Sequence, residues 1–305
     1  MADAPLSPSV VELPGPFEHV LVHTRGLRLH AAVAGDPAAP LIVLLHGSFG
    51  GWFDYLDVIA PLAEGGFHVA AVDARGYGLS DKPPAVAGDD LRTAAGDIAG
   101  LILALGHDDA AVVGSDTGGS VAWALASAYP ERVSALVSVA AAFPSDLRQA
   151  MLTRPWSFAW MIARSLVSRA PSSLLTRIPR LGAVAYRRQL LLNTAPGFHS
   201  SRRFDDTLQL RRTAARIGRA PAAIVRNNRF LTSAVTPRWA SEKVTAPTLL
   251  LEPALPAWRH LNALSRARVA GPVEVTGVPG TKNLPQIEDP SGFVTAVLGF
   301  LGRHL

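Results

Sequence analysis

Short apolar segments, each about the length of one strand, recur along this chain of 305 residues. Most of them run on without alternating apolar and polar residues, which is typical of strands that are covered on both faces. We expect strands at 27–33, 41–45, 69–72, 110–113, 135–139, 248–251 and 273–278. Helical patterns lie between them, at 52–64, 91–105, 118–129 and 290–301. This alternation predicts an α/β fold with a mostly parallel central sheet and helices on both faces.

The strand signals stop between two of these segments. The interval has a helical pattern that is interrupted by several prolines, among them Pro155, Pro196 and Pro221. We therefore predict a core formed by residues 1–143 and 238–305, with a helical cap inserted at 144–237.

Charge is distributed unevenly between the core and the insert. The chain carries a net charge of +5, yet residues 144–232 contain sixteen arginines against three aspartates. Such an asymmetry favours an anionic partner, for example a substrate with an anionic group or an acidic carrier protein. The alternative is a coding bias, because the whole chain uses arginine and contains only three lysines.

Composition excludes several classes of protein. There is no cysteine, so neither a disulfide framework nor a thiolate metal site is expected. No signal peptide and no membrane span is apparent in the sequence, which predicts a cytoplasmic protein. We expect no cofactor, no metal and no nucleic acid, and the sequence does not indicate an oligomeric state.

A glycine-rich turn follows the strand at 110–113. In Val-Gly-Ser-Asp-Thr-Gly-Gly, Asp116 stands between Gly114 and Gly118, where a sharp strand-to-helix bend needs residues without a side chain. A carboxylate in this position can attack an alkyl carbon. The alternative is a structural aspartate that caps the following helix.

A second loop, His-Gly-Ser-Phe-Gly-Gly, begins at His46 after the strand at 41–45. This loop and the glycine-rich turn resemble those of the α/β-hydrolase fold, in which backbone N–H groups of such a loop and of the residue after the nucleophile form an oxyanion hole. We expect these donors to be Ser48 and Thr117. His46 and Gly47 are expected to support the loop.

The third motif begins at Asp73 and reads D-x-R-G-x-G-x-S-x-x-P, with Arg75 as its arginine. Together the three motifs resemble the epoxide hydrolase and haloalkane dehalogenase branch of the α/β-hydrolases, and the resemblance extends over nearly the whole chain. It implies an α/β-hydrolase fold with a helical cap. It also implies that an aspartate forms an alkyl ester, which a histidine–acid pair then hydrolyses.

The chain departs from this pattern where the histidine is expected. The segment beginning Lys-Asn matches the family at Glu288 and Pro290, which puts Asn283 at the histidine position. An amide is no general base near neutral pH. The acid is also missing after the strand at 248–251. Glu252 and His260 are the candidate substitutes, and the triad is predicted to be degenerate.

The predicted cap differs from the family as well. The resemblance implies two cap tyrosines that hold an epoxide oxygen, whereas the insert contains only Tyr186. Trp156, Trp160 and Phe230 are expected in packing rather than in a pocket.

Three functions remain open from the sequence. The favoured one is an enzyme that catalyses isomerisation, cyclisation or elimination of a small hydrophobic molecule, with Asp116 as nucleophile or acid–base group. Burial is expected to raise the pKa of Asp116 and so to suit it to proton transfer. The alternatives are an epoxide hydrolase with a relocated base, and a ligand-binding protein without catalysis.

Overall fold

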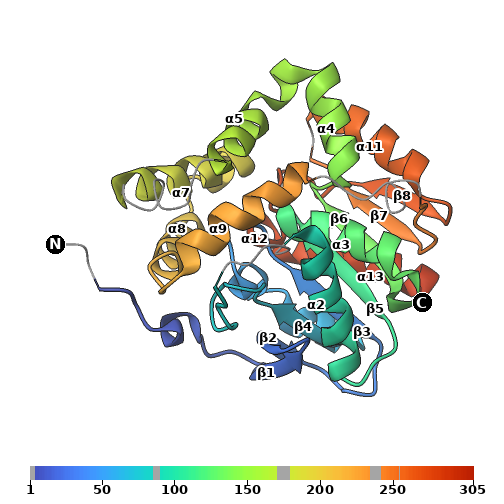
Figure 1. Cartoon of the computed structure of the whole chain (residues 1–305). Coiled ribbons are helices and arrows are strands. Elements are labelled where there is room, and N and C mark those ends of the chain that lie inside the picture. The colour runs from blue at the N-terminus through green and yellow to red at the C-terminus, as the bar shows by residue number, and fades with distance from the viewer. Residues whose placement is uncertain (1–3, 85–89, 170–178, 234–241, 254) are drawn as a thin grey trace.

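One sheet of eight strands organises the part of the chain that the computed structural model describes, namely residues 4–84, 90–169, 179–233, 242–253 and 255–305 (Figure 1). Its strand order is β1-β2-β4-β3-β5-β6-β7-β8. The strands are β1 (Glu18–Thr24), β2 (Leu27–Ala34), β3 (Leu41–Leu45), β4 (His68–Val72), β5 (Ala110–Ser115), β6 (Val133–Val139), β7 (Thr248–Leu251) and β8 (Val273–Thr276). From β4 to β8 every pairing is parallel, whereas β1 and β2 pair antiparallel at one edge.

The two faces of the sheet carry separate hydrophobic cores. Because successive strand residues point to opposite faces, Val43 packs with the helix at 91–104 and its neighbour Leu44 with the helix at 290–304. All residues of β3, β4 and β5 are buried. Continuous apolar segments in the sequence thus correspond to strands that are covered from both sides.

Helices cover both faces and form the insert. In the core they are α1 (Ile59–Glu64), α2 (Leu91–Ala104), α3 (Thr117–Ala128), α11 (Pro256–Arg268), α12 (Pro285–Glu288) and α13 (Pro290–His304). In the insert they are α4 (Pro144–Thr153), α5 (Ala159–Ser168), α7 (Pro179–Asn193), α8 (Arg202–Ala214) and α9 (Ala220–Asn228). Short 3-10 turns are η1 (Pro8–Val11), η2 (Trp52–Tyr55), η3 (Pro130–Arg132), η4 (Pro155–Phe158), η5 (Pro196–Phe198) and η6 (Arg229–Thr232).

The predicted architecture is confirmed, with differences at the edges. Each expected strand is present within a few residues, and β1 adds an antiparallel edge strand that the sequence pattern did not predict. The expected helix at 52–64 is divided into η2 and α1. The predicted domain boundary at 237–238 falls outside the described residues. No helix among those described has the length and apolar content that a membrane span requires.

A buried ion pair joins the insert to the core. Arg211 of α8 donates to both carboxylate oxygens of Asp54 in η2, at 3.1 and 2.9 Å, and both side chains are almost wholly buried. The same guanidinium donates to the Gln189 side chain on α7 at 2.9 Å. This contact fixes α7 and α8 over the loop that follows β3.

Candidate active site

The backbone at Asp116 forms the sharp bend that the glycine pattern predicts. Asp116 lies between β5 and α3 with φ 54° and ψ −117°, a conformation that costs free energy for a residue other than glycine. A Cβ atom on Gly118 would lie 2.3 Å from the Leu45 carbonyl oxygen, and one on Gly114 would lie 2.6 Å from the Gly118 oxygen. The two glycines therefore let β3, β5 and α3 approach closely enough to hold this bend.

The loop after β3 brings its backbone to the Asp116 carboxylate. Ser48 N–H donates to Asp116 Oδ2 at 3.2 Å, and the Thr117 N–H also bonds the carboxylate. A Cβ atom on Gly47 would lie 2.9 Å from Asp116 Cβ, so only glycine permits this approach. Both predicted oxyanion donors thus lie beside Asp116, and their role in catalysis stays a prediction.

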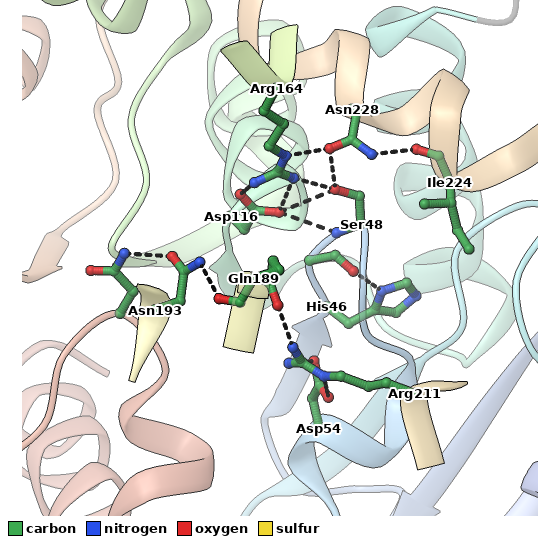
Figure 2. Close-up of polar contacts among 12 residues, drawn as sticks. His46, Ser48, Asp54, Asp116, Arg164, Gln189, Asn193, Arg211, Ile224 and Asn228 are labelled. Carbon is green, nitrogen blue, oxygen red and sulfur yellow. Dashed lines mark hydrogen bonds and ion pairs between the residues drawn. The ribbon is translucent and has the colours of Figure 1, made fainter. Parts of the chain in front are cut away.

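Arg164, on cap helix α5, lies next to Ser48 and pairs with the carboxylate (Figure 2). Its Nη1 donates to Asp116 Oδ1 at 2.8 Å and its Nη2 to Oδ2 at 2.7 Å, which is a bidentate ion pair. The side chain of Arg164 is 7% exposed and that of Asp116 is 19% exposed. The sequence analysis did not identify this charged partner of Asp116.

The pKa of Asp116 is also opposite to the expectation. Burial by itself raises the pKa, but the charge and hydrogen bonds of Arg164 and the N–H groups of Ser48 and Thr117 outweigh it. The net result is a pKa below the usual value for aspartate. Asp116 is thus a carboxylate at neutral pH, which can accept a proton but has none to donate.

Asn228 and Ser48 hold the guanidinium in place. Arg164 Nε donates to Asn228 Oδ1, and Nη2 donates to Ser48 Oγ. The Asn228 amide donates to the Ile224 carbonyl at 2.7 Å, which orients its oxygen toward Arg164. The guanidinium also lies over the Phe49 ring, 5.1 Å from its centroid. The guanidinium of Arg164 is therefore held by Asn228, Ser48 and Phe49 as well as by Asp116.

Both ring nitrogens of His46 are hydrogen-bonded to the backbone. Its Nδ1 lies 2.7 Å from the Gly47 carbonyl oxygen, and its Nε2 lies 3.1 Å from the backbone nitrogen of Ala74. Since a carbonyl only accepts and a backbone N–H only donates, Nδ1 is the donor of this ring and Nε2 the acceptor. Neither nitrogen is left for Asp116.

Asp73 and Arg75 serve the same framework. Buried Asp73 accepts from His30 Nδ1 at 2.9 Å and from the Trp52 and Leu79 N–H groups at 3.1 and 3.0 Å. Burial favours the neutral acid, but the hydrogen bonds from His30 and the Trp52 N–H lower its pKa overall. Arg75 makes a bidentate pair with Asp97 on α2, with both distances 2.8 Å.

Asn283, at the expected histidine position, is bonded to the cap. Its N–H donates to the Asn193 carbonyl at 2.9 Å and its side-chain amide to Asn193 Oδ1 at 2.6 Å. Glu288 accepts from the Lys282 N–H at 2.9 Å and from the Ala195 N–H at 2.6 Å, and burial raises its pKa. This segment therefore anchors α7 to α12 and makes no hydrogen bond to Asp116.

A model of the alpha/beta hydrolase fold family matches residues 40–206, which is more than half of the chain. The chain belongs to this family. The "AB hydrolase superfamily protein YfhM" of Bacillus subtilis is 45% identical over 118 residues, and epoxide hydrolase B of Mycobacterium tuberculosis is 36% identical over 127 residues. These alignments cover 39% and 41% of the chain but only 41% and 36% of the two relatives.

Similarity to solved structures extends over almost the whole hydrolase-fold chain. Epoxide hydrolase A from Mycobacterium thermoresistibile has a TM-score of 0.75 at 26% identity, covering 94% of this chain and 98% of that one. The resemblance to epoxide hydrolases is thereby confirmed, together with the predicted fold class.

The candidate substitute base and acid of this hydrolase-fold protein have other partners. His260 lies on α11 with Nε2 3.4 Å from the Thr153 hydroxyl of α4. Glu252 accepts from the Asn262 side chain at 2.5 Å. Among the described residues, neither makes a hydrogen bond to Asp116.

Aromatic side chains of the insert behave differently from one another. Tyr186, on α7, is buried with its ring edge-on to Phe49 at 5.3 Å, and burial raises the pKa of its phenol. Phe230 lines a cavity of about 40 Å³ together with His46 and Thr117 on the α2 side of the loop. Trp156 is 92% exposed, so the expectation that it packs in the core is wrong.

The sequence analysis missed the cap residues that bond Asp116, its partner Arg164 and the segment at Asn283. Arg164, Asn228 and Asn193 come from three different helices of the insert. Arg164 was one of sixteen arginines there, and no local pattern distinguished it. Within the described residues, no group of three or more His, Asp or Glu side chains is arranged to hold a metal ion.

Proposed function

We propose that this chain is an epoxide hydrolase-like enzyme that transforms a small hydrophobic molecule without hydrolysing it, with Asp116 as the reacting carboxylate. One observation carries the proposal. Asp116 stands at a nucleophile bend in its charged form, and its side-chain partners among the described residues are Arg164 and Ser48 rather than an imidazole.

The absence of a neighbouring base decides which reactions are open to such a carboxylate. Hydrolysis of an alkyl ester requires a group that takes a proton from water beside the ester. Asn283 does not titrate, and its side chain is bonded to Asn193. A reaction that needs only one carboxylate, which either attacks a carbon and is displaced again or accepts a proton and returns it, requires no such group. Isomerisation, cyclisation and elimination are reactions of this kind.

The surroundings of Asp116 support a hydrophobic substrate. Phe49 and Tyr186 pack edge-on beside the guanidinium of Arg164, and Leu284 and Ile287 belong to the same buried cluster. Known relatives bear the name epoxide hydrolase, which also favours a small molecule of limited polarity.

The proposed anionic partner of the cap has less support than the sequence suggested. Two of its arginines, Arg164 and Arg211, are neutralised by the core residues Asp116 and Asp54. An anionic group on the substrate and an acidic carrier protein both stay predictions.

A second candidate function is ligand binding without catalysis. Its specific support is that Arg164 occupies the space over both carboxylate oxygens of Asp116. A permanently closed pair of this kind would leave no reacting oxygen.

Incubation with styrene oxide tests the proposal. We expect no sustained formation of the diol. Intact-mass spectrometry should instead show an adduct of one epoxide per chain that persists, since no imidazole among the described residues bonds Asp116 to activate water for cleavage of the ester. The control Asp116→Asn should give no adduct. Repeated turnover to diol would contradict the proposal, and failure to form either product would favour the binding protein.

A further inference from the structure

The two carboxylate oxygens of Asp116 have different hydrogen-bond partners. Asp116 Oδ2 is held by the Ser48 N–H at 3.2 Å and by Arg164 Nη2 at 2.7 Å. Oδ1 accepts from Arg164 Nη1 at 2.8 Å, whereas the hydroxyl of Ser48 adds a further bond to Oδ2 at 3.2 Å. Oδ1 is therefore the oxygen that can take a proton while both bonds of Ser48 keep the carboxylate in position.

Removal of a proton from a substrate by Asp116 would transfer its negative charge to the substrate. In a buried site, Arg164 would then lose its partner, at a large cost, unless the new anion formed within reach of its N–H groups. A carbonyl oxygen that becomes an enolate oxygen meets this requirement. The charge would pass from one oxygen to another beside the same cation, so the ion pair would exist before and after the step.

The surroundings of Arg164 suit it to pair first with the Asp116 carboxylate and then with a substrate oxyanion. Its side chain is 7% exposed, its Nε is fixed on Asn228, and its plane lies over Phe49. Two Nη groups on one edge of the plane face the oxygens of Asp116, as Figure 2 shows. A planar fork of donors binds a second oxygen anion as well as it binds a carboxylate.

We propose that Arg164 is a catalytic residue that stabilises the oxyanion of a carbonyl substrate with an ionisable hydrogen on the adjacent carbon. This inference rests on the proposed function and names its substrate class. Asp116 Oδ1 takes the hydrogen as a proton, and the C–H electron pair forms a carbon–carbon double bond. The carbonyl π pair moves onto oxygen, which accepts hydrogen bonds from Arg164. If the substrate also has a carbon–carbon double bond next to the carbon that lost the proton, Asp116 returns the proton to the far end of that double bond and the carbonyl re-forms, which completes an isomerisation. If the next carbon instead bears a leaving group, the carbonyl re-forms and the leaving group departs with its bonding pair and takes the proton from Asp116, which completes an elimination.

Tyr186 does not replace Arg164 in this role. Burial raises the pKa of its phenol, so the hydroxyl is a neutral hydrogen-bond donor. Its ring packs edge-on against Phe49, over which the guanidinium of Arg164 lies. A cation stabilises a developing oxyanion more strongly than a neutral hydroxyl does. The step thus needs the charge that the cap supplies through α5.

Binding of para-nitrophenolate provides the test, because a phenolate oxygen has the charge and planarity of an enolate. Asp116→Asn imitates the protonated aspartate and leaves Arg164 without its anion. We therefore expect Asp116→Asn to bind para-nitrophenolate at least about tenfold more tightly than the unmodified chain, at a pH above the phenol's own pKa. The shift in the visible absorbance of the phenolate reports binding.

Adding Arg164→Met to Asp116→Asn should abolish this gain. Adding Arg202→Met, which removes a 94% exposed cap arginine, should preserve it. If the Met variant does not fold by circular dichroism, Arg164→Gln in the same background gives the same reading. Equal affinity of Asp116→Asn and the unmodified chain, or a gain that survives the loss of Arg164, would overturn the role of Arg164. Neither result depends on diol formation, which bears on the proposed function alone.

Discussion

Replacement of Arg164 by methionine removes the cation from a buried pair and keeps most of the aliphatic volume of the side chain. The pair has two hydrogen bonds of 2.8 and 2.7 Å, and both partners are shielded from solvent. Asp116 would be left as a carboxylate with the N–H groups of Ser48 and Thr117. We expect a loss of folding stability that comes from this unpaired charge.

The size of the loss follows from the geometry. Opposite unit charges about 4 Å apart attract by roughly 4 kcal/mol at an effective dielectric constant of about 20. Removing one partner of a buried pair costs about 3–5 kcal/mol. The 19% exposure of the Asp116 side chain and its remaining N–H partners reduce this cost. Arg164→Met should therefore lower the free energy of unfolding by about 2–4 kcal/mol at neutral pH.

Urea unfolding of four chains measures the effect: the unmodified protein, Arg164→Met, Asp116→Asn and the double variant. Because the two side chains interact directly, the double variant should lose at least about 1 kcal/mol less than the sum of the single losses. Arg202→Met, which breaks an exposed pair with Asp206 at 3.7 Å, should change stability by less than about 0.5 kcal/mol. If Arg164→Met costs no more than Arg202→Met, or if the two losses simply add, the reasoning about the pair is refuted.

Two further predictions concern the same site. The folded pKa of Asp116 is lowered, so the pair stabilises the fold above the unfolded pKa of about 4 and its contribution disappears as the pH falls through the folded value. The stability difference between the unmodified chain and Arg164→Met should therefore shrink in urea titrations below about pH 4, and a constant difference would count against the pairing. Gly47→Ala places a Cβ atom 2.9 Å from Asp116 Cβ and should cost about 1–3 kcal/mol. Gly302→Ala, whose Cβ would meet nothing within 4 Å on helix α13, serves as its control and should not destabilise; equal melting temperatures for the two variants would contradict the close approach at Gly47.

The fold was accessible from sequence because its signals are local. Each segment such as 41–45 is apolar throughout, and burial on both faces of a parallel sheet is what such a segment requires. The bend at Asp116 was predictable for the same reason. Gly114 and Gly118 stand where a Cβ atom would collide with neighbouring backbone. Strand β1 was missed because an edge strand is half-exposed and lacks a continuous apolar pattern.

The partners of Asp116 were not accessible from sequence. Arg164 lies 48 positions away from Asp116 along the chain. The sequence pattern gives no reason to choose it over the fifteen other arginines of the insert. The expected rise in the pKa of Asp116 followed from burial alone, and the sign changed because a cation from the cap is present. That Asn283 stands at the histidine position stays a prediction, and its bond to Asn193 depends on how α7 packs.

Sequence by itself determined the sheet, the glycine-supported bend and the aspartate at its tip, because each depends on the volume and polarity of residues that are neighbours in the chain. Only the tertiary structure decided that this aspartate is charged and covered by Arg164. Electrostatic free energy depends on distance in space and on burial, and both are set by the packing of the cap on the core.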